Sequence, residues 1–394
     1  PFSGVYDTFL IPNAHPDPER RLSQLCDAVR LIYASLYSTT ARAYFDASGY
    51  KIEEERMAVV IQELVGTRRG RWYYPLISGT AQSYNYYPVS YLKPDDGLCV
   101  AALGLGPYVV EGGEAHRFCP RYPKLDVVPP GRGLGGTQRW FYALDMERLD
   151  FDLTQGEEAT LSRLDVAEAE ADPGFAMVAS TWSVEDDRLE PGVSARGPRI
   201  VDFAPVLKYD SFPFAEVVEA VLEVGTKSMG IPVEIEYAVS DDGPGGAPVF
   251  YMLQIKPLIQ RSDRVSVDLG AIVRGQCLVA SERCMGNGRV RGVRDIVYVD
   301  PTRWNPAESG AVAAEIAGLN ERLKAEGRPY ALVGPGRWGT RDHSLGVPVN
   351  FSQISNAKAI VEADLPDFRV DSSLGSHFFH NVTAMNIGYF SAAY

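Results

Sequence analysis

The sequence lacks the features that would place the protein in a membrane, a secretory pathway or a nucleic-acid complex. No apolar run approaches the roughly 20 residues that span a bilayer, and no signal peptide is recognisable. The five cysteines are scattered without a CxxC pair, so we expect free thiols and no zinc site. The 51 Asp and Glu residues outnumber the 38 Lys and Arg residues, which gives a net charge of −13. A protein that binds nucleic acid needs clustered Lys and Arg to neutralise phosphates. We therefore expect a cytoplasmic protein that binds neither membrane nor nucleic acid.

The length of 394 residues and the mixed periodicity predict an α+β protein with more than one domain. Apolar residues recur at helical spacing over 18–44, 214–229 and 311–326, and 157–172 resembles an acidic helix. Strand-like runs include 57–65, 72–83, 99–106, 295–299, 330–333 and 357–363. The polar stretch 260–268 is the main expected boundary. We predict one domain over 1–262, with mixed and antiparallel sheets, and an α/β domain of unrecognised type over 263–394.

The most informative stretch is a predicted hairpin formed by residues 233–239 and 249–257. Its two-residue period places Glu234 and Glu236 on one face of the first strand. In the second strand Met252, Gln254 and Lys256 are expected to share a face. Two carboxylates, an amide and an ammonium can thus converge, which suits Mg²⁺ and the phosphates that accompany it. The alternative is an ordinary hairpin with a solvated acidic edge.

Three further motifs each have a functional and a structural interpretation. Residues 103–113 are glycine-rich, so Gly104 and Gly106 are candidates for a phosphate-binding turn or a plain strand-to-turn junction. A Gly-Pro-Gly-Arg-Trp-Gly sequence follows an apolar strand and contains Arg337. It is either an anion-binding turn with Arg337 as its charge, or a tight turn with Trp338 packed in the core. His377 could carry a phosphate, or it could belong to a packed local structure with His380.

Four segments and a pair of strands, in order, resemble parts of phosphoenolpyruvate (PEP) synthase and pyruvate phosphate dikinase. Residues 2–10 resemble the segment after the family's arginine-serine motif, and 59–65 its nucleotide-hinge strand. Residues 77–81 resemble its Ser-Gly-Val strand, and 104–110 its Gly-Leu-Gly-Glu-x-Val-Val element. Residues 234–238 and 251–257 resemble its paired Asp-Ile-Glu-Trp-Ala and Leu-Tyr-x-Leu-Gln-x-Arg-Pro strands. The acidic strand followed by the Gln strand is the most specific of these matches.

The resemblance implies a partial ATP-grasp-like domain of the PEP/pyruvate-binding type, with Mg²⁺ and ATP as cofactors. The positions of Glu234 and Glu236 would hold the metal, and Gln254 would contact the nucleotide. Lys256 would face the phosphates, and we expect Arg337 to act with it. Backbone groups of Gln62, Glu63, Leu64 and Val65 would hold the adenine. The phosphoryl acceptor would be a small molecule or a phosphocarrier.

Several departures from the family pattern limit this expectation. The family's acidic Asp is Glu234, its Arg is Lys256, and the Glu after Gly-Leu-Gly is Pro107. No Thr-x-His-Ala phosphohistidine motif occurs, and the family's first nucleotide subdomain is not matched. We therefore expect an upstream domain in the native chain and no phosphotransferase activity from residues 1–394 alone. The alternatives are a non-catalytic nucleotide-binding or regulatory module and, less specifically, a structural assembly protein.

Overall fold

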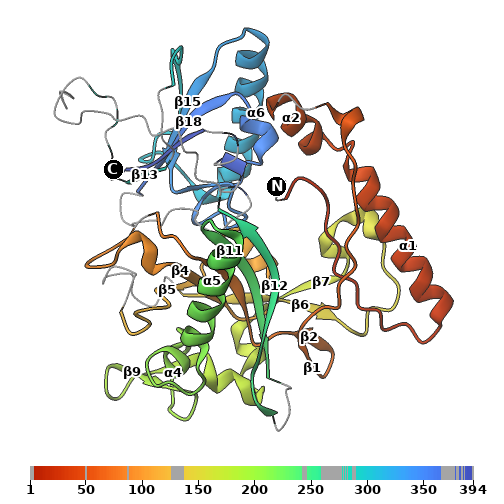
Figure 1. Ribbon diagram of the computed structural model, residues 1–394, viewed down its shortest axis with the longest axis vertical. Coiled ribbons are helices and arrows are strands. Elements are labelled where there is room, and N and C mark those ends of the chain that lie inside the picture. The colour runs from red at the N-terminus through yellow and green to blue at the C-terminus, as the bar shows by residue number, and fades with distance from the viewer. Residues whose placement is uncertain are drawn as a thin grey trace. The chain divides into compact units, whose positions relative to one another are not determined.

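A computed structural model of the chain describes residues 4–48, 51–86, 88–125, 137–241, 246–258 and 290–364, with positions 277, 279, 281, 283–285, 378, 381–382, 385 and 387–392. The chain forms two compact units (Figure 1). The large unit comprises Asp7–Ser35 and Met57–Leu258, and the C-terminal unit comprises Pro1–Tyr6, Leu36–Arg56 and Ile259–Tyr394. This division differs from the predicted domains over 1–262 and 263–394, because residues 1–6 and 36–56 belong to the C-terminal unit and the main division falls after Leu258. In the C-terminal unit Tyr44 packs against Phe351, with ring centroids 6.0 Å apart.

The described residues of the large unit form four α-helices and three sheets, besides short 3-10 helices. Its helices are α1 (Pro18–Ser35), α3 (Pro107–Val110), α4 (Ala204–Leu207) and α5 (Phe214–Met229). Its strands are β1 (Thr67–Arg69), β2 (Trp72–Tyr74), β3 (Ile77–Gln82), β4 (Leu98–Ala102), β5 (His116–Phe118), β6 (Trp140–Asp145), β7 (Leu161–Asp165), β8 (Ala179–Ser183), β9 (Arg188–Pro191), β10 (Arg199–Val201), β11 (Val233–Ser240) and β12 (Val249–Pro257). The sheet orders are β1-β2-β6-β7, β10-β8-β9 and β12-β11-β3-β4-β5.

The C-terminal unit has two described helices, α2 (Thr39–Ser48) and α6 (Ser309–Ala325). Its strands are β13 (Arg283–Met285), β14 (Asp295–Tyr298), β15 (Tyr330–Pro335), β16 (Arg337–Trp338), β17 (Gly346–Val347), β18 (Ala357–Ala363) and β19 (Gly388–Ala392). In the sheet β13-β19-β18-β15-β14, only the β13–β19 pair is antiparallel. Antiparallel sheets in one unit and a largely parallel sheet in the other confirm the predicted α+β class.

The five-stranded sheet of the large unit is covered on one face by α5. This helix spans the predicted residues and buries Val218 and Leu222, whereas Val224 is exposed. It ends at Gly230, whose left-handed conformation (φ 69°) lets its N–H bond back to the carbonyl of Thr226 at 2.9 Å. Close packing against Ile255 leaves no room for a side chain at Gly225. Because α5 covers this face, the opposite face of the sheet is where the predicted acidic pair must lie.

The hairpin of β11 and β12 confirms the predicted strand pair and refines its register. Glu234 lies opposite Lys256, and Glu236 lies opposite Gln254. A bulge follows, so that Tyr237 pairs with Met252. Since one extra residue in a strand reverses the faces beyond it, Met252 lies on the face of Tyr237, and the prediction that it shares a face with Gln254 and Lys256 is wrong.

The alternative interpretation of the hairpin, a solvated acidic edge, is tested by the position of β11 in its sheet. This strand lies between β12 and β3, so it is an interior strand, and Glu234 is only 1% exposed. The carboxylate is therefore enclosed rather than solvated, and the alternative of a solvated acidic edge is excluded for this residue.

Two other expectations from the sequence are wrong. Residues 57–65 form no strand, and Val60 and Ile61 are 83% and 67% exposed, because no neighbouring strand pairs with this segment in the described sheets. Residues 157–172 do not form one acidic helix: they contain two short 3-10 helices (Glu157–Ala159 and Val166–Ala169) around β7. Pairing of β7 with β6 overrides the local helical preference there.

Within the described part of the chain, no helix combines the length and apolarity needed to cross a membrane.

Candidate functional site

Strands β3 and β11 together present a polar face opposite the one covered by α5. The register places Gln82 opposite Glu234 and Thr80 opposite Glu236, so these four side chains share one face. Residues that alternate with them, such as Ile235 and Ala81, are buried in the core. The strand alternation thus separates an apolar face from a cluster of oxygen-bearing side chains.

A hydrogen bond from a buried glutamine holds Glu234 in place, and a buried tyrosine lies within electrostatic reach. Gln82 donates from Nε2 to Glu234 Oε2 at 2.5 Å, and Gln82 is itself only 2% exposed. Burial, followed by the nearby Tyr84 and Glu234, raises the pKa of Tyr86 to about 12. Its phenol therefore keeps its proton at any physiological pH and lies within electrostatic reach of the Glu234 carboxylate.

Glu236 and Lys256 form an ion pair across the hairpin. Lys256 Nζ donates to Glu236 Oε1, and the two side chains are only 12% and 26% exposed. Gln254, directly opposite Glu236, is exposed. The structure therefore brings together the four predicted residues of the hairpin, with the ammonium bound to one of the two carboxylates.

The same face continues across the sheet toward the glycine-rich segment. Thr80 is opposite Val100 of β4, which is opposite Arg117 of β5, so the row from Gln254 to Arg117 crosses all five strands. Val100 packs with Tyr108 of α3 in a small apolar cluster that is bordered by Trp140 and Tyr142. Arg117, 8% exposed, adds a cation to the row.

Gly104 and Gly106 differ in what the structure requires of them. Gly104 has a positive φ of 89°, and a Cβ there would lie 2.8 Å from the Cβ of Phe141. Its carbonyl accepts a hydrogen bond of 2.6 Å from Ser78 on β3. These contacts agree with a strand-to-turn junction at Gly104. Gly106 has nothing within 4 Å of its Cβ position, so packing does not explain the glycine there.

Residues 62–65 form no strand and lie beside the sheet that contains β2, not beside β11. Leu64 packs against the large core, and its carbonyl accepts a 2.7 Å hydrogen bond from Tyr73 of β2. Gln62 and Glu63 are exposed. The structure does not bring these residues to the acidic pair, and their adenine-binding role stays a prediction.

Arg337 belongs to the C-terminal unit, not to the unit that contains the acidic pair. It is 2% exposed and precedes Trp338, which is fully buried and donates from Nε1 to the carbonyl of Val361 at 3.0 Å. The backbone N–H of Trp338 donates to Glu362 Oε1 at 3.0 Å. Packing of Trp338 agrees with the tight-turn interpretation, and anion binding by Arg337 stays a prediction. His377 and His380 lie outside the described residues.

The oxygen atoms around the acidic pair suit a hard divalent cation. Besides the two carboxylates, Gln82 Oε1 and Thr80 Oγ1 are buried without a hydrogen-bond partner. In the described part of the chain, no cluster of three or more His, Cys, Asp or Glu side chains could hold a metal. A cation on this face would thus depend on few carboxylates, which is typical of Mg²⁺ bound with nucleotide phosphates. The residues therefore fit Mg²⁺.

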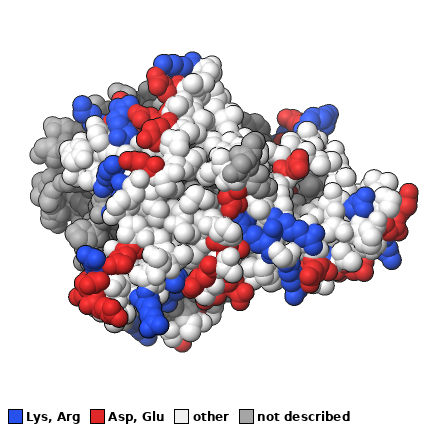
Figure 2. Space-filling model, turned by 90° about the horizontal axis from the view of Figure 1, so that it is seen from below, with Lys and Arg blue, Asp and Glu red and all other residues white. Residues whose placement is uncertain are grey.

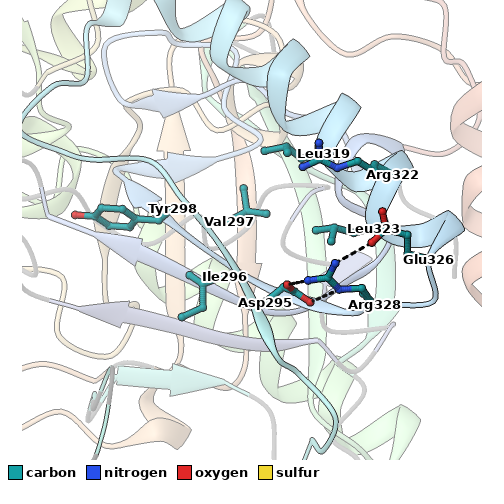
Figure 3. Close-up of a pocket in the computed structure, with 9 residues that line it drawn as sticks. All are labelled: Asp295, Ile296, Val297, Tyr298, Leu319, Arg322, Leu323, Glu326 and Arg328. Carbon is teal, nitrogen blue, oxygen red and sulfur yellow. Dashed lines mark hydrogen bonds and ion pairs between the residues drawn. The ribbon is translucent and has the colours of Figure 1, made fainter.

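A hollow of about 600 Å³ lies in the C-terminal unit between β14 and α6 (Figure 3). Arg328 on its rim forms ion pairs with Asp295 and Glu326, so this cation is already neutralised. None of the predicted site residues lines this hollow.

On the face shown in Figure 2, Lys and Arg occur in small groups beside Asp and Glu, without one continuous basic surface.

Thr80, Gln82 and Tyr86 were not among the site residues predicted from the sequence. A signal was present in β3, where Ser78, Thr80 and Gln82 alternate with apolar residues in a strand that is otherwise suited to a core. That alternation predicts a polar face, but the pairing of β3 with β11 depends on contacts more than 150 residues apart in sequence. The partner of Gln82 could therefore not be identified from the pattern.

Comparison with known proteins supports the resemblance found in the motifs. A family profile described as "Pyruvate phosphate dikinase, AMP/ATP-binding domain" matches residues 1–272. A search among curated proteins finds no match. The family match covers more than half of the 394 residues and includes every strand of the polar face. The chain therefore belongs to the pyruvate phosphate dikinase AMP/ATP-binding domain family.

Proposed function

We propose that the large unit binds Mg-ATP on the polar face of β3, β11 and β12, in an ATP-grasp-like arrangement. The protein would then be the nucleotide-binding part of a phosphotransferase related to PEP synthase and pyruvate phosphate dikinase. The observation that carries this proposal is the convergence of Glu234, Glu236, Gln254 and Lys256 on one hairpin, beside two buried oxygen atoms of β3. The family match supports a nucleotide as the ligand.

Each residue of the hairpin has a role that follows from its charge and position. Glu234 and Glu236 would hold Mg²⁺, which when bound neutralises charge on the phosphate oxygens. Lys256 would exchange its bond to Glu236 for one to a phosphate, since the cation competes for the same carboxylate. Gln254, exposed opposite Glu236, would contact the nucleotide, and backbone groups at Gly104 and Gly106 would approach the phosphates.

The other predicted site residues lie outside the hairpin. Gln62, Glu63, Leu64 and Val65 would provide backbone contacts to the adenine, and Arg337 would contribute a second cation to transfer. The acceptor would be a small molecule or a phosphocarrier. These assignments rest on the family resemblance and on the residue types.

Calorimetric titration of Mg-ATP into the full native chain tests the proposal. Glu236→Ala should weaken binding by at least about tenfold, because it removes a carboxylate ligand of the cation. Glu223→Ala is a matched control, since Glu223 lies on the exposed surface of α5 in an ion pair with Lys227. If Glu236→Ala binds Mg-ATP as tightly as the wild type, the site assignment is wrong.

A second candidate is a nucleotide-binding or regulatory module without turnover. It is favoured by Pro107, which begins α3 where the related enzymes carry a glutamate and which has no group for acid, base or metal chemistry. Such a module would retain ATP unchanged during a long incubation. Release of AMP or ADP in the presence of an acceptor such as pyruvate would exclude it.

A further inference from the structure

Two buried atoms on β3 lack the hydrogen bonds that buried polar atoms normally make. They are Oε1 of Gln82 and Oγ1 of Thr80, and both residues are only 2% exposed. Leaving a buried donor or acceptor unsatisfied costs about 1–3 kcal/mol. The two atoms are two residues apart on one strand, so they face the same side of the sheet. A ligand on that side would satisfy both.

The orientation of the Gln82 amide is fixed by its neighbour. Its nitrogen Nε2 donates to Glu234 Oε2 at 2.5 Å, so the other end of the amide, Oε1, makes no bond to this carboxyl group. Oε1 is therefore the free end of the amide, and it is a neutral oxygen beside an enclosed carboxylate.

The cross-strand register surrounds the acidic pair with oxygen atoms of three kinds. Gln82 is opposite Glu234 and Thr80 is opposite Glu236, and such pairs have Cβ atoms about 4.5–5.5 Å apart. The set contains carboxylate, amide and hydroxyl oxygens and no sulfur or imidazole. Carboxylate and carbonyl oxygens select Mg²⁺, Mn²⁺ and Ca²⁺ over the softer transition metals.

We propose that β3 forms part of the divalent-cation site, with Gln82 Oε1 and Thr80 Oγ1 as oxygen ligands, directly or through bound water. Gln82 then has a second role, since its Nε2 holds Glu234 in position. The inference rests on the proposed nucleotide function and extends it to a strand to which the family resemblance assigns no ligand. It also accounts for why two buried polar atoms occur beside the acidic pair.

Titration of Mn²⁺ into the full chain, followed by the electron paramagnetic resonance signal of free Mn²⁺, tests the proposal. It is performed with the cation alone and again with ATP present. Thr80→Val removes the hydroxyl while keeping the branched shape, and Gln82→Met removes the amide. Each should weaken Mn²⁺ binding by about tenfold. Thr80→Ser, which keeps a hydroxyl, should bind as the wild type does.

Gln138→Met separates a ligand effect from a loss of stability. Gln138 is also a buried glutamine of the large unit, but its Oε1 accepts from the N–H of Leu103 and its Nε2 donates to the carbonyls of Leu103 and Trp140. Its replacement should lower thermal stability and leave Mn²⁺ affinity unchanged. Thr80→Val should not lower thermal stability without cation, and should raise it, because it removes a buried hydroxyl that has no partner.

The outcomes distinguish this inference from the proposed function. Suppose that Thr80→Val and Gln82→Met both bind Mn²⁺ as tightly as the wild type, whereas Glu236→Gln does not. Strand β3 would then supply no ligand, and the proposed nucleotide site would still stand. Equal affinity in Glu236→Gln and the wild type would overturn both. A loss in Thr80→Val that Thr80→Ser restores, with Gln138→Met unaffected, would support the role of β3.

Discussion

At the scale of single residues, the ion pair between Lys256 and Glu236 determines how the hairpin meets a ligand. Both side chains are largely shielded from solvent, so each needs an opposite charge nearby. A divalent cation at Glu236 would displace the ammonium, which would then need another anion. Phosphate oxygens of the same nucleotide provide one. The pair therefore couples cation binding to phosphate binding.

Replacing the lysine should separate these two events. Lys256→Met should weaken Mg-ATP binding by about tenfold, or about 1.4 kcal/mol, because the phosphates lose a cation. It should not weaken binding of Mn²⁺ alone, because Glu236 is released. Lys227→Met on the exposed surface of α5 is the matched control. Unchanged calorimetric affinity of Lys256→Met for Mg-ATP would contradict the assigned role of the lysine.

A structural prediction concerns the buried carboxylate of Asp145. The Arg71 guanidinium donates to both of its oxygens, at 2.8 and 2.5 Å, and lowers the pKa of Asp145 although the side chain is enclosed. A carboxyl with a lower pKa in the folded state stabilises the fold above its ordinary pKa of about 3.9. This contribution is lost as the pH falls through the lowered value.

Asp145→Asn should therefore reduce the free energy of unfolding by about 1–2 kcal/mol at pH 7, and the difference from the wild type should shrink below about pH 4. Urea unfolding at both pH values measures it. Asp27→Asn, in an exposed pair with Arg30, should cost less than about 1 kcal/mol. A difference at Asp145 that stays constant down to pH 3 would show that the ion pair is not its source.

At the scale of elements, the glycine-rich segment combines a packing role with an open position. Gly104→Ala should destabilise the large unit by about 1–3 kcal/mol, because the new Cβ meets Phe141 and the backbone has a positive φ. Gly106→Ala should leave stability unchanged, since nothing lies near its Cβ.

If phosphates approach the backbone at Gly106, the same substitution should weaken ATP binding. Thermal unfolding and calorimetry on the two variants separate these effects. A Gly106→Ala variant that binds ATP as the wild type does would restrict the segment to a structural role.

Elements with strong local periodicity could be predicted from the sequence, whereas those set by distant pairing could not. Helix α5 and the hairpin of β11 and β12 match their predicted spans closely because their apolar residues keep a helical or a two-residue period. The apolar run 57–65 has the composition of a buried strand but no partner in the described sheets. The bulge that turns Met252 away has no sequence signal, because it depends on the register with Tyr237.

The candidate site shows the same division. The two-residue period was sufficient to place Glu234 and Glu236 on one face of β11 and to bring Gln254 and Lys256 of β12 toward them, and the family resemblance added their roles toward a nucleotide. The contact between Gln82 and Glu234 could not be predicted from the sequence, because it depends on the order of strands in the sheet. Burial of Glu234 likewise depends on neighbours distant in sequence, such as Gln82, which a two-residue period does not reveal.

At the scale of the whole molecule, the two units carry different parts of the proposal. The acidic pair, Lys256 and the glycine-rich segment belong to the large unit, whereas Arg337 belongs to the C-terminal unit. The C-terminal unit has a sheet of its own, with α6 and a buried Trp338. Arg337 therefore does not belong to the unit that contains the acidic pair.

Hydrogen exchange with and without Mg-ATP tests which units respond to the nucleotide. Peptides from β3, β11 and β12 should exchange more slowly with Mg-ATP, because binding suppresses local opening of these strands. Peptides covering 334–339 should be protected only if Arg337 contacts the ligand. Protection confined to the C-terminal unit would place the nucleotide outside the large unit and contradict the proposal.

The central claim, that the face between β3 and β12 holds a cation-bound nucleotide, is tested most directly by locating the cation. A crystal of the full chain grown with Mn²⁺ and a non-hydrolysable ATP analogue would reveal the metal by its anomalous scattering. The account predicts a peak between Glu234 and Glu236, with Lys256 turned toward the phosphates. A peak elsewhere, such as the hollow between β14 and α6, with the Glu236–Lys256 pair unchanged, would contradict it.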